Sequence, residues 1–337
     1  MEKVNDRYKK ILEIRVGSHL YGTNTPSSDL DYSGIVLPSE TEVFGFENME
    51  EILLNIVSKD NTGKNTSGAI DKKYYEFRKF CHLASECNPN VLEQLFVNLE
   101  NIIYISPEGK DLLDRKFLFL SKESINTKFL AYSRSQKKKM TIKPENYESL
   151  KDVLSFLYHY LGTDTIINLS KEESISKSRQ LFIELRKEID DKKLPVEFKD
   201  SFIKIGDINI NKNLNVKNVI QSIDSRLKSA GSRKELWEKY GYDTKFGMNL
   251  IRLLLQGKEL LETGNLIFPL ADRDFLLDIK TGKYTLNEVL DFAEVIESEF
   301  DKVYHSSNMQ SKSNYNEIQN FVICTLKNYF RNKEVIE

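Results

Sequence analysis

Asp29 and Asp31 are the residues whose types and spacing best suit chemistry. Alternate residues of a β-strand point to the same face, so a strand through this segment would present both carboxylates together. Paired carboxylates form a hard oxygen site for Mg²⁺, which prefers carboxylates, water and substrate phosphate. Upstream, Gly17 and Ser18 can bring backbone N–H groups and a hydroxyl close to a triphosphate. The stretch GSHLYGTNTPSSDLDYSGIVLPSE, residues 17–40, therefore predicts a joint metal and nucleotide site.

The same stretch also matches a calcium-binding EF-hand loop, in which oxygen ligands surround an invariant glycine. The residues that fill the EF-hand positions are Asp29, Asp31, Ser33, Gly34 and Glu40. An EF-hand loop must join two helices, but Pro26 and Pro38 interrupt the segments where those helices would run. Residues 35–38, IVLP, are also typical of a strand. A catalytic strand therefore explains the stretch better than a calcium loop does.

The carboxylates must be positioned by a sheet, and hydrophobic patterns predict its strands and the helices that follow. We expect a short helix near residues 3–10 and strands at 11–16, 29–37, 49–57 and 69–75. Helices should follow at 76–86 and 88–96, the second capped by Asn88 with Pro89 at its first position. Further helices are expected at 121–140, 144–162, 170–192, 214–229, 243–263, 285–305 and 314–332. We make no prediction for the structure of 190–215, and the polar segment 58–69 is expected to form a loop.

Composition restricts the class of protein. With 337 residues, 40% of them hydrophobic and 30% charged, the chain should fold as a globular protein of two domains or of one large domain with insertions. Its formal net charge of −2 means that a nucleic-acid partner would have to be held by local basic patches. The three cysteines have no CxxC spacing and suit a reducing compartment, and no apolar stretch is long enough to span a bilayer. We therefore expect a soluble, cytoplasmic protein without a membrane partner.

The pattern GS-x3-G-x5-SDLD resembles the active-site signature of the DNA polymerase β superfamily of nucleotidyltransferases. Two further blocks, YYEFRKFCHLASECNPNVLEQLF and YGYDTKFGMNLIRLLLQGKELLETG, look like a bacterial and phage branch of that superfamily associated with RNA repair. The resemblance implies a third carboxylate on a neighbouring strand. Its position before EFRKF favours Asp71 over Glu76 for that carboxylate.

The resemblance also implies a two-metal reaction with an NTP as substrate. Asp29 and Asp31 would hold one Mg²⁺ or Mn²⁺ that carries the β- and γ-phosphates. Together with Asp71 they would hold a second that activates the acceptor hydroxyl, and pyrophosphate would leave. The residues expected to bind the nucleotide are Gly17, Ser18, Gly22, Ser28, Lys245, Asn249 and Arg252.

Several basic residues have two interpretations each. Lys245, Asn249, Arg252 and Gln256 recur at helical spacing and form one polar stripe, which could contact the triphosphate or simply face solvent. Phosphate contacts with RNA are a second hypothesis for basic residues elsewhere, although most charge runs on helices are solvated. The residues concerned are Arg78, Lys79, Arg134, Lys137, Lys138 and Lys139.

These inferences combine into an α+β protein. Residues 1–105 should form a nucleotidyltransferase domain with a mixed, mainly antiparallel sheet, and residues 106–337 an all-helical domain that closes the nucleotide and acceptor cleft. The expected reaction is transfer of an NMP from an NTP to an acceptor hydroxyl, with an RNA end as the favoured acceptor. A protein or small-molecule acceptor is the main alternative, and a nucleotide- or RNA-binding module without catalysis is a second. Intact acidic residues count against such a module, because clustered anions repel phosphate unless metal is present.

Overall fold

The structure of this protein is a computed structural model that describes most of the chain. The described residues are 8–26, 28–47, 49–56, 70–140, 144–161, 187, 196–199, 202–211, 216–231 and 234–334. Two compact units are present, one formed by Met1–Lys137 with Lys245–Glu337 and the other by Lys138–Thr244. In this part of the chain no helix is both long and apolar enough to cross a membrane.

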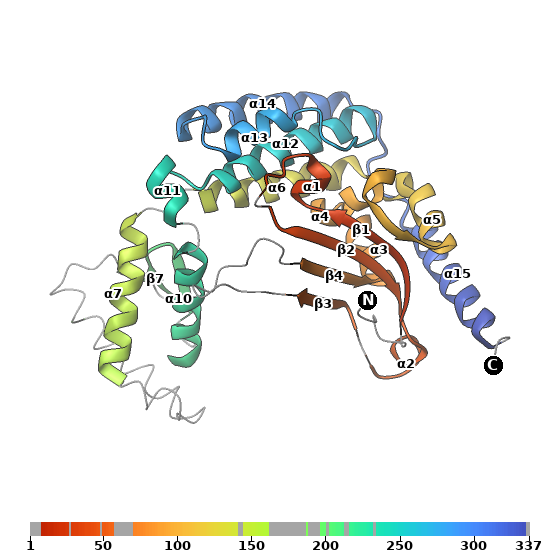
Figure 1. Ribbon diagram of the computed structural model, residues 1–337, viewed down its shortest axis with the longest axis horizontal. Helices are drawn as coiled ribbons and strands as arrows, with labels where there is room; N and C mark the ends of the chain where they lie inside the picture. The colour runs from red at the N-terminus through yellow and green to blue at the C-terminus, as the bar shows by residue number, and fades with distance from the viewer. Residues whose placement is uncertain are drawn as a thin grey trace. The chain divides into compact units, whose positions relative to one another are not determined.

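The first unit is built on a five-stranded sheet in the order β3-β4-β2-β1-β5. Strands β1 to β4 are labelled in Figure 1. Strands β2 and β4 are parallel neighbours, whereas the other neighbouring strands pair antiparallel. Apolar residues of the inner strands are fully buried, among them Leu12, Ile14 and Ile35. The strands are β1 (Lys9–Val16), β2 (Leu30–Leu37), β3 (Glu51–Ile56), β4 (Ile70–Glu76) and β5 (Ile102–Ile105).

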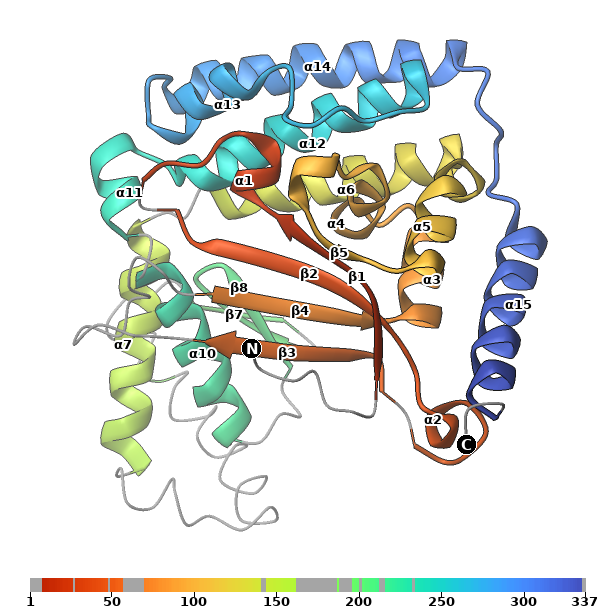
Figure 2. The same cartoon turned by 45° about the vertical axis from the view of Figure 1, so that its right-hand side comes forward.

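Helices from both ends of the chain complete this unit. Phe77 and Phe80 on one face of α3 are fully buried, and the ring of Phe77 meets that of Phe321 in α15 at 5.7 Å. Figure 2 shows α12, α13 and α14 beside one another and next to α1. The α-helices are α1 (Ser18–Tyr21), α2 (Glu40–Val43), α3 (Phe77–Ser85), α4 (Pro89–Leu92), α5 (Pro107–Asp114), α6 (Lys122–Met140), α12 (Thr244–Thr263), α13 (Arg273–Lys280), α14 (Leu286–Ser306) and α15 (Tyr315–Glu334). Short 3₁₀ helices are η1 (Glu93–Phe96), η2 (Leu99–Asn101) and η3 (Lys116–Phe119).

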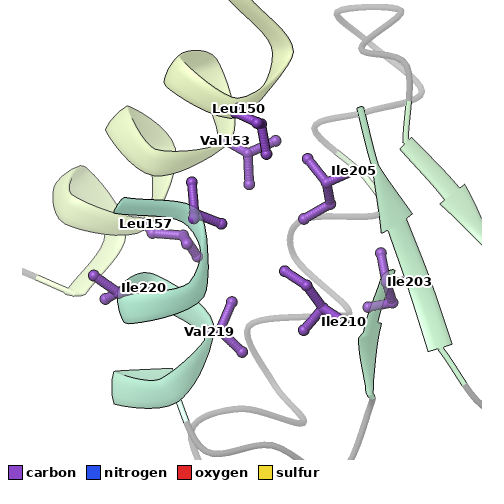
Figure 3. Close-up of a cluster of buried hydrophobic side chains, with 9 residues drawn as sticks. Leu150, Val153, Leu157, Ile203, Ile205, Ile210, Val219 and Ile220 are labelled. Carbon is purple, nitrogen blue, oxygen red and sulfur yellow. The ribbon is translucent and has the colours of Figure 1, made fainter. Parts of the chain in front are cut away.

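The second unit has its own core between two helices and a small sheet. Buried Leu and Val side chains of α7 and α10 point toward the isoleucines of β7 and β8 (Figure 3). Its strands pair in the order β6-β7-β8, and both pairs are antiparallel. The elements are α7 (Pro144–Leu161), β6 (Val196–Phe198), β7 (Phe202–Ile205), β8 (Ile208–Asn211), α10 (Val216–Gly231) and α11 (Lys234–Tyr240).

The predicted α+β class is confirmed, with a mixed, mainly antiparallel N-terminal sheet and a helical C-terminal region. The predicted cap is present, since Asn88 accepts a hydrogen bond from the N–H of Asn90. Helix α14 begins with a capping box formed by Thr285 and Glu288. The small sheet at 196–211 departs from the all-helical expectation and lies in the segment for which no prediction was made.

Other expectations differ at the ends of the first sheet. The expected helix at 3–10 is wrong for Lys9 and Lys10, which begin β1, and residues 1–7 lie outside the described part. Strand β5 was not expected. The predicted loop at 58–69 and, apart from Lys187, the helix at 170–192 also lie outside the described residues. The two compact units do not follow the expected domain boundary at 105/106, so the two-domain assignment stays a prediction.

Candidate active site

Asp31 and Asp71 lie directly opposite each other on the parallel strands β2 and β4. Paired residues of neighbouring strands point to the same face of a sheet, so the two carboxylates project together. Both line a pocket of about 410 Å³. Asp29 lies just before the first residue of β2, where the strand ladder does not fix it. The structure thus brings together two of the three predicted carboxylates on one face and leaves the third at the entrance to the strand.

The carboxylates interact electrostatically. The pKa of Asp31 is raised from 3.8 to about 6, first by burial and then by the negative charges of Asp71 and Asp29. The charge of Lys245 acts in the opposite direction and lowers it. Lys245, predicted to bind the nucleotide, is therefore close enough to the site to act on Asp31. When acidic neighbours raise the pKa of a carboxylate, a bound cation would stabilise its ionised form.

The predicted glycine turn packs directly against this cluster. Gly17 has a φ of 69° and precedes α1, which begins at Ser18. A Cβ atom on Gly17 would lie 2.8 Å from the Oδ2 atom of Asp31, closer than such contacts allow. The backbone conformation at position 17 therefore favours glycine, and a larger residue there would also displace the Asp31 carboxylate.

Two other residues predicted to bind the nucleotide shape the turn. Gly22 ends α1 in the left-handed conformation at a φ of 76°, and a Cβ atom there would lie 2.8 Å from Cβ of Pro269. The hydroxyl of Ser28 accepts a hydrogen bond of 2.8 Å from the N–H of Thr25. Both positions have a structural role in the loop between α1 and β2, and their contact with a nucleotide stays a prediction.

Residues near the C-terminal end of the unit fasten the turn. The N–H of Leu270 donates to the carbonyl of Tyr21 at 3.2 Å, and the ammonium group of Lys280 donates to the carbonyl of Thr23 at 2.7 Å. The pKa of Lys280 is lowered by burial and by the charge of Lys245. Two positive charges therefore lie near the segment that follows the glycine turn.

A buried polar network connects the turn to α12. The carboxylate of Glu93 accepts hydrogen bonds from the hydroxyl of Tyr21 at 2.7 Å and from Nη1 of Arg252 at 3.0 Å. The guanidinium carbon of Arg252 lies 4.3 Å from the centre of the Tyr21 ring. Arg252 also donates to Gln256 at 2.7 Å and to Asn249 at 3.3 Å. Tyr21 and Glu93 line the carboxylate pocket, so the network forms part of its wall.

This network changes the interpretation of the polar stripe on α12. Arg252 is 4% exposed and Gln256 1% exposed, so the alternative of a solvated face is wrong for both residues. Their partner Glu93 was not predicted, because it lies 159 residues from Arg252 in the sequence. A direct contact of Arg252 or Asn249 with the nucleotide stays a prediction.

The structure also separates Asp71 from the rival candidate Glu76. Glu76 is 3% exposed and caps α3, where its carboxylate accepts hydrogen bonds from the N–H groups of Arg78 and Lys79. That capping role occupies Glu76, whereas Asp71 faces Asp31. The side chains of Arg78 and Lys79 pair with Glu76 and Glu50 respectively.

The other predicted nucleic-acid contacts lie on the exposed side of α6. The side chains of this group are exposed, as expected for either RNA contact or a solvated face. The group consists of Arg134, Lys137, Lys138 and Lys139.

The oxygen donors suit Mg²⁺, which is commonly held by one or two carboxylates together with water and substrate phosphate. Asp31 and Asp71 provide such a pair in the pocket. Among the described residues, however, no group of three or more His, Cys, Asp or Glu side chains has an arrangement that could hold a metal. The expectation that Asp29 completes the metal site stays a prediction.

The EF-hand alternative is wrong. Its ligand positions Asp31 and Ser33 and its glycine position Gly34 lie in β2, which is hydrogen-bonded to β1 on one side and β4 on the other. An EF-hand loop cannot be part of such a ladder, because its backbone must curl around the ion.

Three comparisons with known proteins found similarities to this chain. Residues 2–168 match the model of a family described as "RlaP: RNA repair pathway DNA polymerase beta family". An uncharacterized 38.9 kDa protein of Enterobacteria phage T4, from the nrdC-mobD intergenic region, is 25% identical over 316 residues, which cover 90% of this chain and 91% of the phage protein. A solved nucleotidyltransferase-like protein from Exiguobacterium sibiricum is 10% identical, with 84% of each chain covered and a TM-score of 0.22.

Proposed function

We propose that this chain, a nucleotidyltransferase of the polymerase β type, transfers an NMP from an NTP to the hydroxyl of an RNA end. The proposal starts from the match of residues 2–168 to the RNA repair pathway DNA polymerase β family. The observation that carries this proposal is the pairing of Asp31 with Asp71 in one pocket, with Gly17 against the Asp31 carboxylate. The RNA acceptor rests on the family description alone.

Each part of the site has a role in this reaction. Asp31 and Asp71, with Asp29, would hold Mg²⁺ or Mn²⁺, which supplies charge neutralisation and Lewis acidity at the phosphates when bound. The turn at Gly17 and Ser18 would bind the triphosphate, assisted by the charge of Lys245. The acceptor oxygen forms a bond to the α-phosphorus as the bond to the β-phosphate oxygen breaks, and pyrophosphate leaves. Asp71 would receive the proton of the acceptor hydroxyl.

The buried network would keep the parts of this site in register. Glu93 connects Tyr21 of α1 with Arg252 of α12, so the glycine turn is fixed relative to the helix that carries Lys245. Positioning of this kind matters because small displacements of reacting groups can reduce a rate by about a hundredfold.

The test is transfer of label from each α-labelled NTP into RNA, run beside total protein as a competing acceptor, with Mg²⁺ or Mn²⁺. Asp31→Asn and Asp71→Asn should each abolish transfer, whereas the exposed control Asp301→Asn on α14 should retain it. Label that enters RNA with wild type and not with the two site variants supports the proposal. Label in protein alone would overturn the RNA acceptor, and transfer by both site variants would overturn the site.

A further inference from the structure

Different strands flank the Asp31 and Asp71 pair on its two sides. Strand β1 and the glycine turn lie beyond Asp31, whereas β3, the outer strand of the described sheet, lies beyond Asp71. If the triphosphate lies at Gly17, the acceptor must approach from the side of β3. The residues of β3 and β4 near Asp71 therefore decide which acceptor fits.

That side carries a cation and an exposed apolar side chain on the same face as the carboxylates. Lys73 follows Asp71 at the alternate position of β4, about 6.7 Å along the strand. Leu53 of β3 pairs with Lys73, so the two side chains lie next to each other. Leu53 is 64% exposed, and both residues line the pocket of Asp31 and Asp71.

Lys73 is oriented by its neighbours. Its ammonium group lies 2.9 Å from the carboxylate of Glu51 and 4.4 Å from the centre of the Tyr75 ring. Burial would lower the pKa of Lys73, but hydrogen bonds with Glu51 and Tyr75 outweigh that effect and raise it. The ion pair with Glu51 is about one-third exposed on each side, and pairs of that kind contribute little free energy. A phosphate can therefore replace Glu51 as the partner of Lys73 at small cost.

We propose that Lys73 and Leu53 form the subsite for the terminal nucleotide of a single-stranded RNA acceptor. Lys73 binds the backbone phosphate of that nucleotide, and Leu53 packs against its base. The separation of Lys73 from Asp71 is comparable to the length of one nucleotide, so a terminal hydroxyl lies at Asp71 while its own phosphate lies at Lys73. This inference rests on the proposed function, which makes Asp71 the acceptor side. A cation beside an apolar platform is the chemistry by which single strands are held without reading their sequence.

Glu51 provides a matched variant that separates binding from structure. Lys73→Gln removes both the ion pair and the cation, whereas Glu51→Gln removes the ion pair and keeps the cation. A role of Lys73 limited to the ion pair predicts equal effects of the two variants. A phosphate-binding role predicts that only Lys73→Gln weakens RNA binding. Lys110→Gln, at an exposed ion pair on α5, controls for the change in net charge.

The measurement is fluorescence anisotropy of a labelled single-stranded RNA of about 12 nucleotides, titrated at several KCl concentrations. Lys73→Gln should raise the Kd about 3- to 10-fold and reduce the slope of log Kd against log salt by about 0.7. Leu53→Ala should raise the Kd about 3-fold without changing the slope. Glu51→Gln and Lys110→Gln should bind like wild type, or more tightly for Glu51→Gln. The KM for NTP should be unchanged in Lys73→Gln.

Three results would overturn the inference: equal binding by wild type and Lys73→Gln, equal weakening by Lys73→Gln and Glu51→Gln, or no RNA binding by wild type. Each can be told apart from failure of the proposed function. If Asp31→Asn and Asp71→Asn still abolish transfer to another acceptor, the nucleotidyl transfer stands and only the RNA subsite is wrong.

Discussion

Replacing Asp31 with asparagine is expected to stabilise the metal-free protein while it abolishes transfer. The pKa of Asp31 is raised from 3.8 to about 6 because the carboxylate is buried beside Asp71 and Asp29. A folded-state pKa above the unfolded value means that this contribution to stability is fully present below pH 3.8 and is lost as the pH rises through about 6. At pH 7.5 the ionised carboxylate is therefore destabilising, and asparagine at this position is not.

The magnitude follows from the shift. Two pKa units correspond to about 3 kcal/mol in the free energy of unfolding, and screening by solvent at this partly exposed carboxylate reduces that to about 1 to 2 kcal/mol. In a domain of this size such a gain raises the Tm by about 2 to 6 °C. At pH 5 about half of the gain should remain, because the carboxylate of wild type is then largely protonated.

The assay is thermal unfolding in EDTA at pH 7.5 and pH 5, repeated at pH 7.5 with 10-fold increments of Mg²⁺. Wild type should gain stability from Mg²⁺ by mass action, and Asp31→Asn should gain less. Asp301→Asn, an exposed aspartate on α14, is the control for loss of one negative charge. An Asp31→Asn protein that is no more stable than wild type at pH 7.5, or whose gain does not shrink at pH 5, would refute the electrostatic reasoning.

Two further predictions concern the turn and the buried network. Gly17→Ala should reduce kcat/KM by at least about a hundredfold with little change in the far-UV circular dichroism spectrum, since a Cβ would press on the Asp31 carboxylate; near-normal turnover would contradict this. Arg252→Met should lower the free energy of unfolding, measured in urea, by about 3 to 5 kcal/mol because it leaves Glu93 buried without its cation. Adding Glu93→Gln to Arg252→Met should recover part of that loss, and additive losses would show that the two residues are not coupled.

The sequence was sufficient to predict the strand that carries the carboxylates. Asp29 and Asp31 fall in or beside β2, and Asp71 falls in β4. The β-branched and aromatic residues around them are typical of strands. The role of Gly17 in the turn was also predictable, since few residues other than glycine allow a close approach of backbone to ligand. The parallel pairing that puts Asp71 opposite Asp31 could not be predicted from the sequence pattern, because the register between distant strands depends on tertiary packing.

Other features could not be predicted for similar reasons. Four-residue β5 is shorter than the windows in which alternation can be recognised, and it forms through its pairing with β1. Arg252 has the helical spacing of a solvated stripe, and only the approach of Glu93 from a distant part of the chain makes it buried. A charged residue on a helix is either solvated by water or paired with an opposite charge, and the local sequence does not distinguish these two environments.

The hydrogen bond between Lys280 and the carbonyl of Thr23 joins residues 257 positions apart. A ribosome that adds about 5 to 20 residues per second needs roughly 13 to 50 seconds to synthesise the chain between them. The strands that carry the carboxylates emerge early, yet the loop after the glycine turn gains its support only near the end of translation. Truncated chains that stop before α13 would contain every proposed catalytic carboxylate and still lack the hydrogen bond by which Lys280 supports the loop after the turn.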